Sequence, residues 1–138
     1  ETPLLIFLDT DTEILERLPM DVLTYLDSKD FCTIKRRMGC TDICGYQGSG
    51  VVDSGIMSYN LQRNGADVAK YWYNYYKNGG AFEEVIWADH YILTSVIKHL
   101  EGGLDIGGLD AEWGAPFGHI NDYIAHHRGA QYEDRDYR

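Results

Sequence analysis

The sequence predicts an α/β protein with a mixed sheet flanked by helices, and three features lead to that prediction. An uninterrupted apolar segment, Leu4–Leu8, lies near the start of the chain and is typical of a buried strand. Two longer stretches, 66–77 and 82–100, have helical character and end at glycine-containing segments. Shorter strand-like segments lie between these regions, at 31–34 and 51–59. Strands that alternate with helices are typical of the α/β class.

The first elements follow from the apolar spacing. Because the segment 4–8 shows no alternation of apolar and polar residues, we expect both of its faces to be covered. Polar residues take over at Asp9, and we expect a short helical turn over 13–18 that Pro19 interrupts. Apolar residues at a spacing of three then predict a helix over 20–26.

The middle of the chain is expected to contain two strands and a loop. The strand at 31–34 runs into a basic cluster, 35–37, which is typical of a solvated run, with phosphate contact by arginine as the alternative. The stretch 38–50 is rich in glycine and polar residues and predicts a loop. The strand at 51–59 is expected to be interrupted at 53–55, where Asp-Ser-Gly occurs.

The last third of the chain shows weaker patterns. After Leu104 the sequence is glycine-rich and aromatic, with no clear helix and a short apolar piece at 123–125. We expect a single α/β domain over 1–130 that is only part of a larger fold, followed by a loose tail at 131–138.

Composition limits the function classes. The chain has 138 residues, of which 44% are hydrophobic, so it can bury a core. Its formal net charge of −10 argues against a nucleic-acid backbone or an anionic membrane as the main partner. The same charge suits a protein that holds a divalent cation against a phosphate. No apolar run is long enough to span a membrane, and the three cysteines are expected to be free and reduced, so we expect a cytoplasmic protein.

The strongest chemical signal is the pair Asp9 and Asp11, which directly follows the first strand. In open α/β sheets, ligands bind beyond the carboxyl ends of strands. Two carboxylates separated by one residue can share a hard cation such as Mg²⁺ or Mn²⁺, which then bridges a diphosphate. A solvated acidic turn or a helix cap remains the alternative.

Four segments together resemble the GT-A glycosyltransferases. Leu4–Leu15 resembles the DxD segment, whose acidic pair holds Mn²⁺ or Mg²⁺ on the diphosphate of a nucleotide sugar. Val51–Asn60 resembles the Ser-Gly strand of the acceptor half, and Trp87–His90 resembles an acidic motif at a helix start. Tyr123–Gly129 resembles a late segment whose histidine completes the metal shell. The segments occur in the order and at the intervals that are usual for the family.

The resemblance implies a role for particular residues. The implied metal ligands are Asp9, Asp11 and His126, with His127 and His119 as alternatives to the last. Asp9, Asp11 and Arg128 are the implied cofactor-binding residues. The other implied site residues are Asp53, Ser54, Gly55 and Trp87 for the substrates and Asp89 as the catalytic residue.

The implied activity is metal-dependent transfer of a sugar from a nucleotide-sugar donor to an unidentified acceptor. If the reaction inverts the anomeric centre, Asp89 would take the proton of the acceptor hydroxyl; a helix cap is the alternative role for this residue. The family also has a nucleotide-binding half that precedes the DxD strand. This chain begins almost at that strand, so the GT-A-like fold is expected to lack that half, with a preceding segment or a second chain completing it.

Two other functions remain open. Phosphatases of the haloacid dehalogenase type also have an apolar strand followed by Asp-x-Asp, with the first aspartate as the nucleophile. Their pattern continues with threonine or valine where this chain has Glu13. The second alternative is a non-catalytic structural or partner-binding module that keeps a GT-A-like fold.

Overall fold

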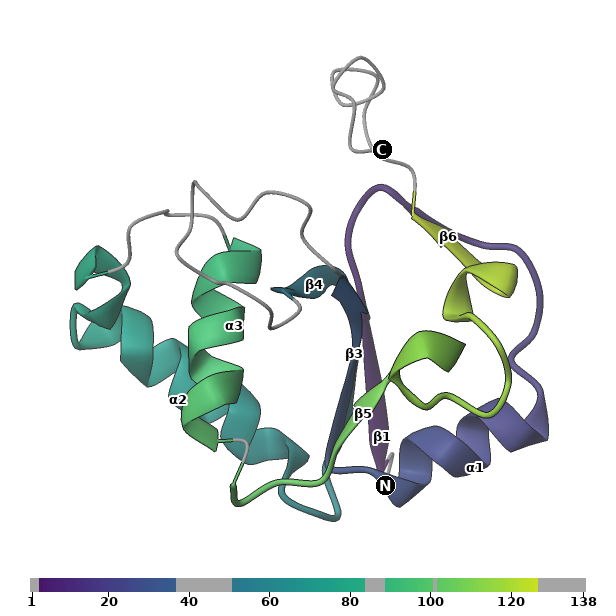
Figure 1. Ribbon diagram of the computed structural model, residues 1–138, viewed down its shortest axis with the longest axis horizontal. Coiled ribbons are helices and arrows are strands. Elements are labelled where there is room, and N and C mark those ends of the chain that lie inside the picture. Colours follow the sequence, from purple (N-terminus) through teal and green to yellow (C-terminus); the bar gives the residue numbers. More distant parts are fainter. Residues whose placement is uncertain (1–2, 37–50, 84–88, 101, 127–138) are drawn as a thin grey trace.

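The computed structural model describes residues 3–36, 51–83, 89–100 and 102–126, and its centre is a four-stranded mixed sheet (Figure 1). The strand order is β1-β4-β3-β5, with β4 antiparallel to both neighbours and β5 parallel to β3. A separate antiparallel pair is formed by β2 and β6. The strand bounds are β1 Leu4–Leu8, β2 Thr12–Ile14, β3 Phe31–Arg36, β4 Val51–Asn60, β5 Ile106–Gly108 and β6 Ile124–His126.

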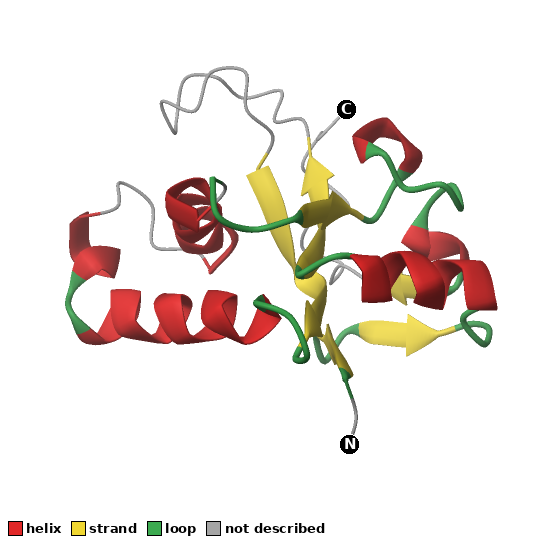
Figure 2. Ribbon diagram, turned by 90° about the horizontal axis from the view of Figure 1, so that it is seen from below, coloured by secondary structure: helices red, strands yellow, loops and turns green. Residues whose placement is uncertain are grey.

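Helices cover both faces of the main sheet, as Figures 1 and 2 show. The α-helices are α1 Met20–Ser28, α2 Gly65–Lys77 and α3 Asp89–Leu100, and the 3₁₀ helices are η1 Gly80–Glu83, η2 Ala111–Trp113 and η3 Ile120–Asp122. Helices α2 and α3 pack on one face, while α1 and the segment from η2 to β6 pack on the other. The predicted α/β class, with a mixed sheet flanked by helices, is therefore confirmed.

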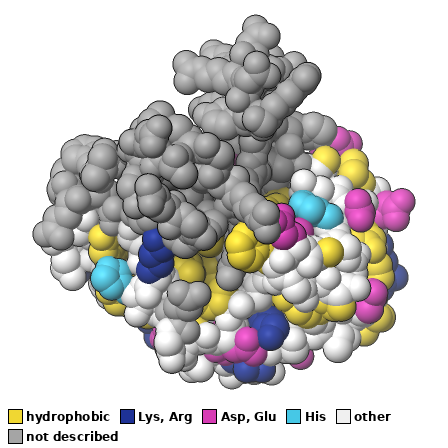
Figure 3. All heavy atoms as spheres, viewed as in Figure 1, with side chains coloured by type: hydrophobic (Ala, Val, Ile, Leu, Met, Phe, Trp, Pro, Cys, Tyr) yellow, Lys and Arg dark blue, Asp and Glu magenta, His cyan; other side chains and the backbone are white. Residues whose placement is uncertain are grey.

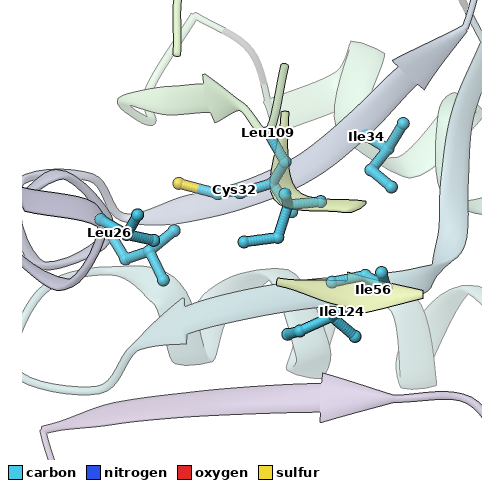
Figure 4. Close-up of a cluster of buried hydrophobic side chains, with 8 residues drawn as sticks. Leu26, Cys32, Ile34, Ile56, Leu109 and Ile124 are labelled. Carbon is cyan, nitrogen blue, oxygen red and sulfur yellow. The ribbon is translucent and has the colours of Figure 1, made fainter. Parts of the chain in front are cut away.

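The sheet separates two buried hydrophobic clusters. The cluster on the α1 face is drawn in Figure 4, where side chains from α1, β3, β4 and β6 converge. Its buried members are Val22, Leu26, Cys32, Ile34, Ile56, Leu109, Ile120 and Ile124. The cluster on the other face joins α2 and α3 to the sheet through Phe31, Val52, Met57, Tyr59, Val68, Leu93 and Ile97. In β4, Ile56 belongs to the α1-face cluster and the next residue, Met57, to the other one, as the pleat of a strand requires.

Four predicted elements are confirmed. The helices expected at 20–26 and 66–77 are α1 and α2, and the strands expected at 31–34 and 51–59 are β3 and β4. Each observed end lies within two residues of the predicted one. Local apolar spacing was enough to find these elements, because each one buries a stripe or face of its own side chains.

The prediction that both faces of the first strand are covered is wrong. β1 lies at the edge of the sheet, and its burial alternates along the chain. The side chains of Leu5 and Phe7 are 50% and 46% exposed, whereas Leu4, Ile6 and Leu8 pack against the α1-face cluster. An apolar run without alternation shows only that both faces are apolar. Whether another element covers the second face depends on the rest of the fold.

The helical turn predicted over 13–18 is also wrong. Thr12–Ile14 forms β2 instead, because the distant strand β6 supplies its hydrogen-bonding partners. Pro19 precedes α1 at its N-cap position rather than interrupting a helix. The helix predicted over 82–100 is observed as the end of η1 and as α3, and residues 84–88 lie outside the described part.

The glycine-rich segment after Leu104 contains β5, which the sequence patterns did not indicate. Its glycines allow close packing. A β-carbon at Gly107 would lie 2.8 Å from Tyr25 Oη, and one at Gly108 would collide with the β-carbon of Trp113. The lack of side chains, which made this segment look irregular, is what lets it lie as a strand beside β3. The predicted tail at 131–138 lies outside the described residues.

Candidate metal and substrate site

The end of β1 lies directly beside the middle of β4. The backbone N–H of Asp9 donates a hydrogen bond of 2.8 Å to the carbonyl oxygen of Gly55. This bond adds one pair to the ladder that ends with Leu8 opposite Ile56. The antiparallel register therefore brings the Asp-x-Asp segment next to the Ser54-Gly55 segment at the backbone level, although some 40 residues separate them in the chain.

A tight turn presents the two aspartates at the surface. The N–H and the hydroxyl of Thr12 both donate to the carbonyl oxygen of Asp9, at 3.1 and 2.6 Å. One carboxylate oxygen of Asp9 accepts a hydrogen bond of 2.8 Å from the N–H of Thr10, which holds that side chain over the turn. Both Asp9 and Asp11 are exposed to solvent, so a cation from solution can reach their carboxylates.

The short pair β2–β6 brings the C-terminal histidine segment to the same turn. His126 lies opposite Thr12, the residue that follows Asp11. Beyond the pair, the N–H of Leu15 donates to the carbonyl oxygen of Tyr123 at 2.8 Å, which extends the association. The backbone of His126 is thus next to the acidic turn. Its side chain is outside the described part, so its role as a metal ligand stays a prediction.

The segment 53–55 lies where β4 separates from β3. Thr33 pairs with Met57, and Lys35 pairs with Val52, so the single residue Ile34 faces the four residues 53–56 of β4. Against β1, β4 pairs over residues 56–60 without a register shift, and this ladder ends before residues 53 and 54. The predicted interruption at 53–55 is therefore observed as a break in the pairing with β3, within a continuous strand. Irregularities of this kind are frequent next to binding sites, because they redirect side chains and end the pairing.

Helix α3 begins at the end of the sheet where β1 ends and β4 begins (Figure 1). The N–H of Val52 donates a hydrogen bond of 3.1 Å to the hydroxyl oxygen of Thr94, which fixes α3 against the start of β4. Asp89 is the first residue of α3. Its backbone lies about 7.5 Å from that of Thr94 along the helix axis, toward the N-terminus of the helix. The side chain of Asp89 is outside the described part.

The described residues account for only part of the predicted site. Among their side chains, no group of three or more His, Cys, Asp or Glu is placed to hold a metal ion. Trp87 and Arg128 lie outside the described residues, as do the side chains of Asp53, Asp89 and His126. The described part therefore supplies two carboxylates and the backbone arrangement around them. The basic cluster 35–37 likewise has no described side chains.

A buried acid that the sequence reasoning did not single out lies after β5. Asp110 is 6% exposed and precedes η2, and its carboxylate accepts a hydrogen bond of 3.0 Å from the N–H of Trp113, the last residue of η2. Its backbone forms a bridge with His119, the residue named above as an alternative ligand. Burial raises the pKa of Asp110, and the Trp113 N–H and the nearby His119 offset this only in part. A capping pattern, Asp before Ala-Glu-Trp, was the available sequence signal.

His119 already makes a local hydrogen bond with one of its ring nitrogens. The N–H of Asn121 donates to its Nδ1 at 3.0 Å, which caps η3. A proton on Nδ1 would break this bond, so the structure favours the tautomer with the proton on Nε2. This local role weakens the case for His119 relative to His126 as the third ligand.

The space-filling view in Figure 3 shows acidic side chains scattered over the right-hand part of this face. No helix in the described part of the chain combines the length and the apolar character that a bilayer span requires.

Comparison of the chain with models of protein families, with curated proteins and with solved structures finds no match.

Proposed function

We propose that this chain is the acceptor-side, metal-binding part of a glycosyltransferase that uses a nucleotide-sugar donor. The proposal rests on one observation above all: the backbone brings three segments singled out in the sequence to one end of the sheet. Asp9 bonds to Gly55, and Thr12 pairs with His126. These backbone pairings support the proposal because they bring the acidic turn beside the other two segments.

The residues at this turn fit a hard divalent cation. Carboxylate oxygens are the preferred ligands of Mg²⁺ and Mn²⁺, and Mn²⁺ also accepts an imidazole nitrogen. In this proposal Asp9, Asp11 and His126 hold the cation. When bound, the cation would stabilise the negative charge that develops on the leaving nucleoside diphosphate.

Other residues of the chain would orient the two substrates. Asp53 and Ser54 lie where β4 leaves β3 and would position the acceptor hydroxyl, together with Trp87. Asp89 would accept the proton of that hydroxyl in an inverting reaction. Arg128 would contact the donor diphosphate, for which a planar guanidinium is well suited.

Thermal unfolding tests the cation site. At about ten times its dissociation constant, Mn²⁺ should stabilise the fold by roughly 1.4 kcal/mol, which raises the melting temperature by several degrees. A nucleoside diphosphate should increase the shift further. The double variant D9N/D11N should lose the response to Mn²⁺. The double variant E13Q/E16Q removes two neighbouring charges and should keep it, because these carboxylates lie outside the turn.

Turnover separates this function from its alternatives. Together with the preceding segment or second chain that completes the fold, the chain should release nucleoside diphosphate from a panel of nucleotide sugars, in a reaction that depends on Mn²⁺ and is lost in D11N. Hydrolysis of an aryl phosphate that is lost in D9N would instead indicate a phosphatase with a nucleophilic aspartate. A chain that shows neither turnover nor a Mn²⁺ response would be a partner-binding module, and the proposal would be wrong.

A further inference from the structure

One long edge of the main sheet has no neighbouring strand among the described residues. β1 is the outermost strand in the order β1-β4-β3-β5. Natural edge strands are usually protected from other chains by charged residues, proline or bulges. The segment Leu4–Leu8 has none of these, and its register with β4 shows no shift. We call this outer edge of Leu4–Leu8, with the side chains of Leu5, Phe7 and Leu61, the β1 edge.

The register identifies which backbone groups point outward. Asp9 donates to Gly55, and Leu61 donates to Pro3 at 2.6 Å, so odd-numbered residues of the first strand carry the bonds to β4. Bonding direction alternates along an antiparallel strand. The N–H and C=O groups at positions 4, 6 and 8 therefore point away from β4. They form the row of donors and acceptors to which an added strand can bond.

The side chains at this edge continue an apolar face past the helices that cover it. Leu5 lies opposite Tyr59, and Phe7 lies opposite Met57. Tyr59 and Met57 are buried under α2 and α3, at 6% and 1% exposure, while their partners on β1 are about half exposed. Leu61, opposite Pro3, is 46% exposed. The hydrophobic surface of the sheet thus extends to an edge that no described helix covers.

We propose that the β1 edge binds an extended segment of a second polypeptide, which adds a fifth strand to the sheet. The outward row of backbone groups requires an extended partner. Apolar side chains on both faces of β1 favour a partner with apolar residues on both of its faces. The net charge of −10, with Asp9 and Asp11 just beyond Leu8, favours lysine or arginine at the end of the partner that lies beside these acids. A second copy of this chain would bring the same negative charge and is the poorer fit.

Selection from a displayed library of random dodecapeptides, with the full chain as bait, tests this surface. The winning peptides should be apolar in the middle and basic at the end that lies beside Asp9 and Asp11. The variant F7E should weaken their binding about tenfold or more. M20E places the same charge at another exposed apolar side chain, 71% exposed at the start of α1, and should leave binding unchanged.

A backbone variant keeps every side chain and so answers the concern that F7E disturbs the fold. Cys32 allows a synthetic 1–31 peptide to be ligated to a recombinant fragment that begins at that residue. N-methylation of Ile6 in the synthetic part removes one outward donor and should abolish binding. N-methylation of Phe7 would remove a bond to β4 instead and should lower stability.

Amide hydrogen exchange gives a direct readout of the edge. In the free chain the amides of Ile6 and Leu8 should exchange faster than that of Phe7, and the selected peptides should slow them. Slow exchange of both amides in the free monomer, or failure of selection to yield strand-like peptides, would overturn the proposal. Protection that grows with protein concentration, with a doubling of mass, would assign the edge to a second copy and would also overturn it. None of these results depends on sugar transfer.

Discussion

The two ends of the main sheet carry carboxylates in opposite environments. At one end, Asp9 and Asp11 lie on an exposed turn after β1. At the other, Asp30 precedes β3 and is 3% exposed. Its carboxylate accepts hydrogen bonds from Asp105 N–H at 2.8 Å, Arg63 Nε at 3.0 Å and Asn64 N–H at 3.3 Å. Asp30 therefore ties the starts of β3, α2 and β5 together.

The bonding partners of Asp30 explain its charge state. Burial by itself would raise the pKa of Asp30, but the hydrogen bonds from Asp105, Asn64 and Arg63 outweigh it and lower the pKa below the usual 3.8. The described contacts of Asp9, by comparison, are within its own turn and with Gly55. The comparison indicates that one acid serves the fold, whereas the other can serve a ligand at little cost in stability.

The largest expected effect concerns the close packing around Asp30. A β-carbon at Gly65 would collide with the carbonyl oxygen of Asp30 and lie 2.5 Å from the backbone nitrogen of Asn60. Backbone atoms cannot move aside as a flexible side chain can. The variant G65A should therefore lose about 3 kcal/mol or more of the free energy of unfolding, measured in urea.

Gly102 is the matched control, because a β-carbon there would meet nothing within 4 Å. G102A should unfold within about 0.5 kcal/mol of the parent chain. Equal, small effects at both glycines would show that the Asp30 end is less tightly packed than the structure indicates.

The second prediction compares the two acids directly through D30N and D9N, which remove the same charge. D30N presents an amide N–H₂ to donors that need an acceptor. It should lower the free energy of unfolding by about 2–3 kcal/mol. D9N should change the free energy of unfolding by about 0.5 kcal/mol or less, since its carboxylate is exposed. Urea unfolding at neutral pH measures both.

The difference between the parent chain and D30N should also depend on pH. Because the pKa of Asp30 is lower in the folded chain, its carboxylate contributes stability that is complete above the usual pKa of 3.8. That contribution is lost as the pH falls through the lower, folded-state value. The gap between the two proteins should thus be constant near neutral pH and shrink in acid. A gap that widens on acidification would contradict the assigned hydrogen bonds.

Among the substitutions at buried positions, the smallest effect is expected at Asp110, which combines burial with a capping hydrogen bond. Asparagine caps as well as aspartate and can keep the bond from Trp113, while it removes the buried charge. Because burial raises the pKa of Asp110, the charged form is disfavoured in the fold. At neutral pH the free energy of unfolding of D110N should therefore equal that of the parent chain or exceed it by about 1 kcal/mol at most.

The pH dependence at Asp110 has the opposite sign to that at Asp30. The parent chain should gain stability relative to D110N as the pH falls through the raised folded-state pKa of Asp110, because protonation neutralises the buried carboxylate. A clear loss of stability in D110N at neutral pH would instead show that the ionised carboxylate is needed, with His119 as a basic partner that lowers its pKa.

Sequence patterns found the elements whose signal is local. The helix over 66–77 and the strand at 51–59 each carry their own apolar face, and both are present within one residue of the predicted ends. The patterns missed β5 and mistook β2 for a helical turn, because these three-residue strands depend on partners far along the chain. The prediction that both faces of β1 are covered was wrong for a related reason, because coverage also depends on elements far along the chain.

For the candidate site, the sequence alone was enough to place an acidic pair after an apolar strand and to pick out Ser54-Gly55 and His126 as further residues of interest. Only the tertiary structure decided that these segments meet at the backbone level, and that no other described strand pairs with the outer edge of β1. The physical reason is that strand pairing joins distant segments through backbone hydrogen bonds. Those bonds are nearly the same for every residue type, so the identity of the partner strand leaves little trace in the local sequence.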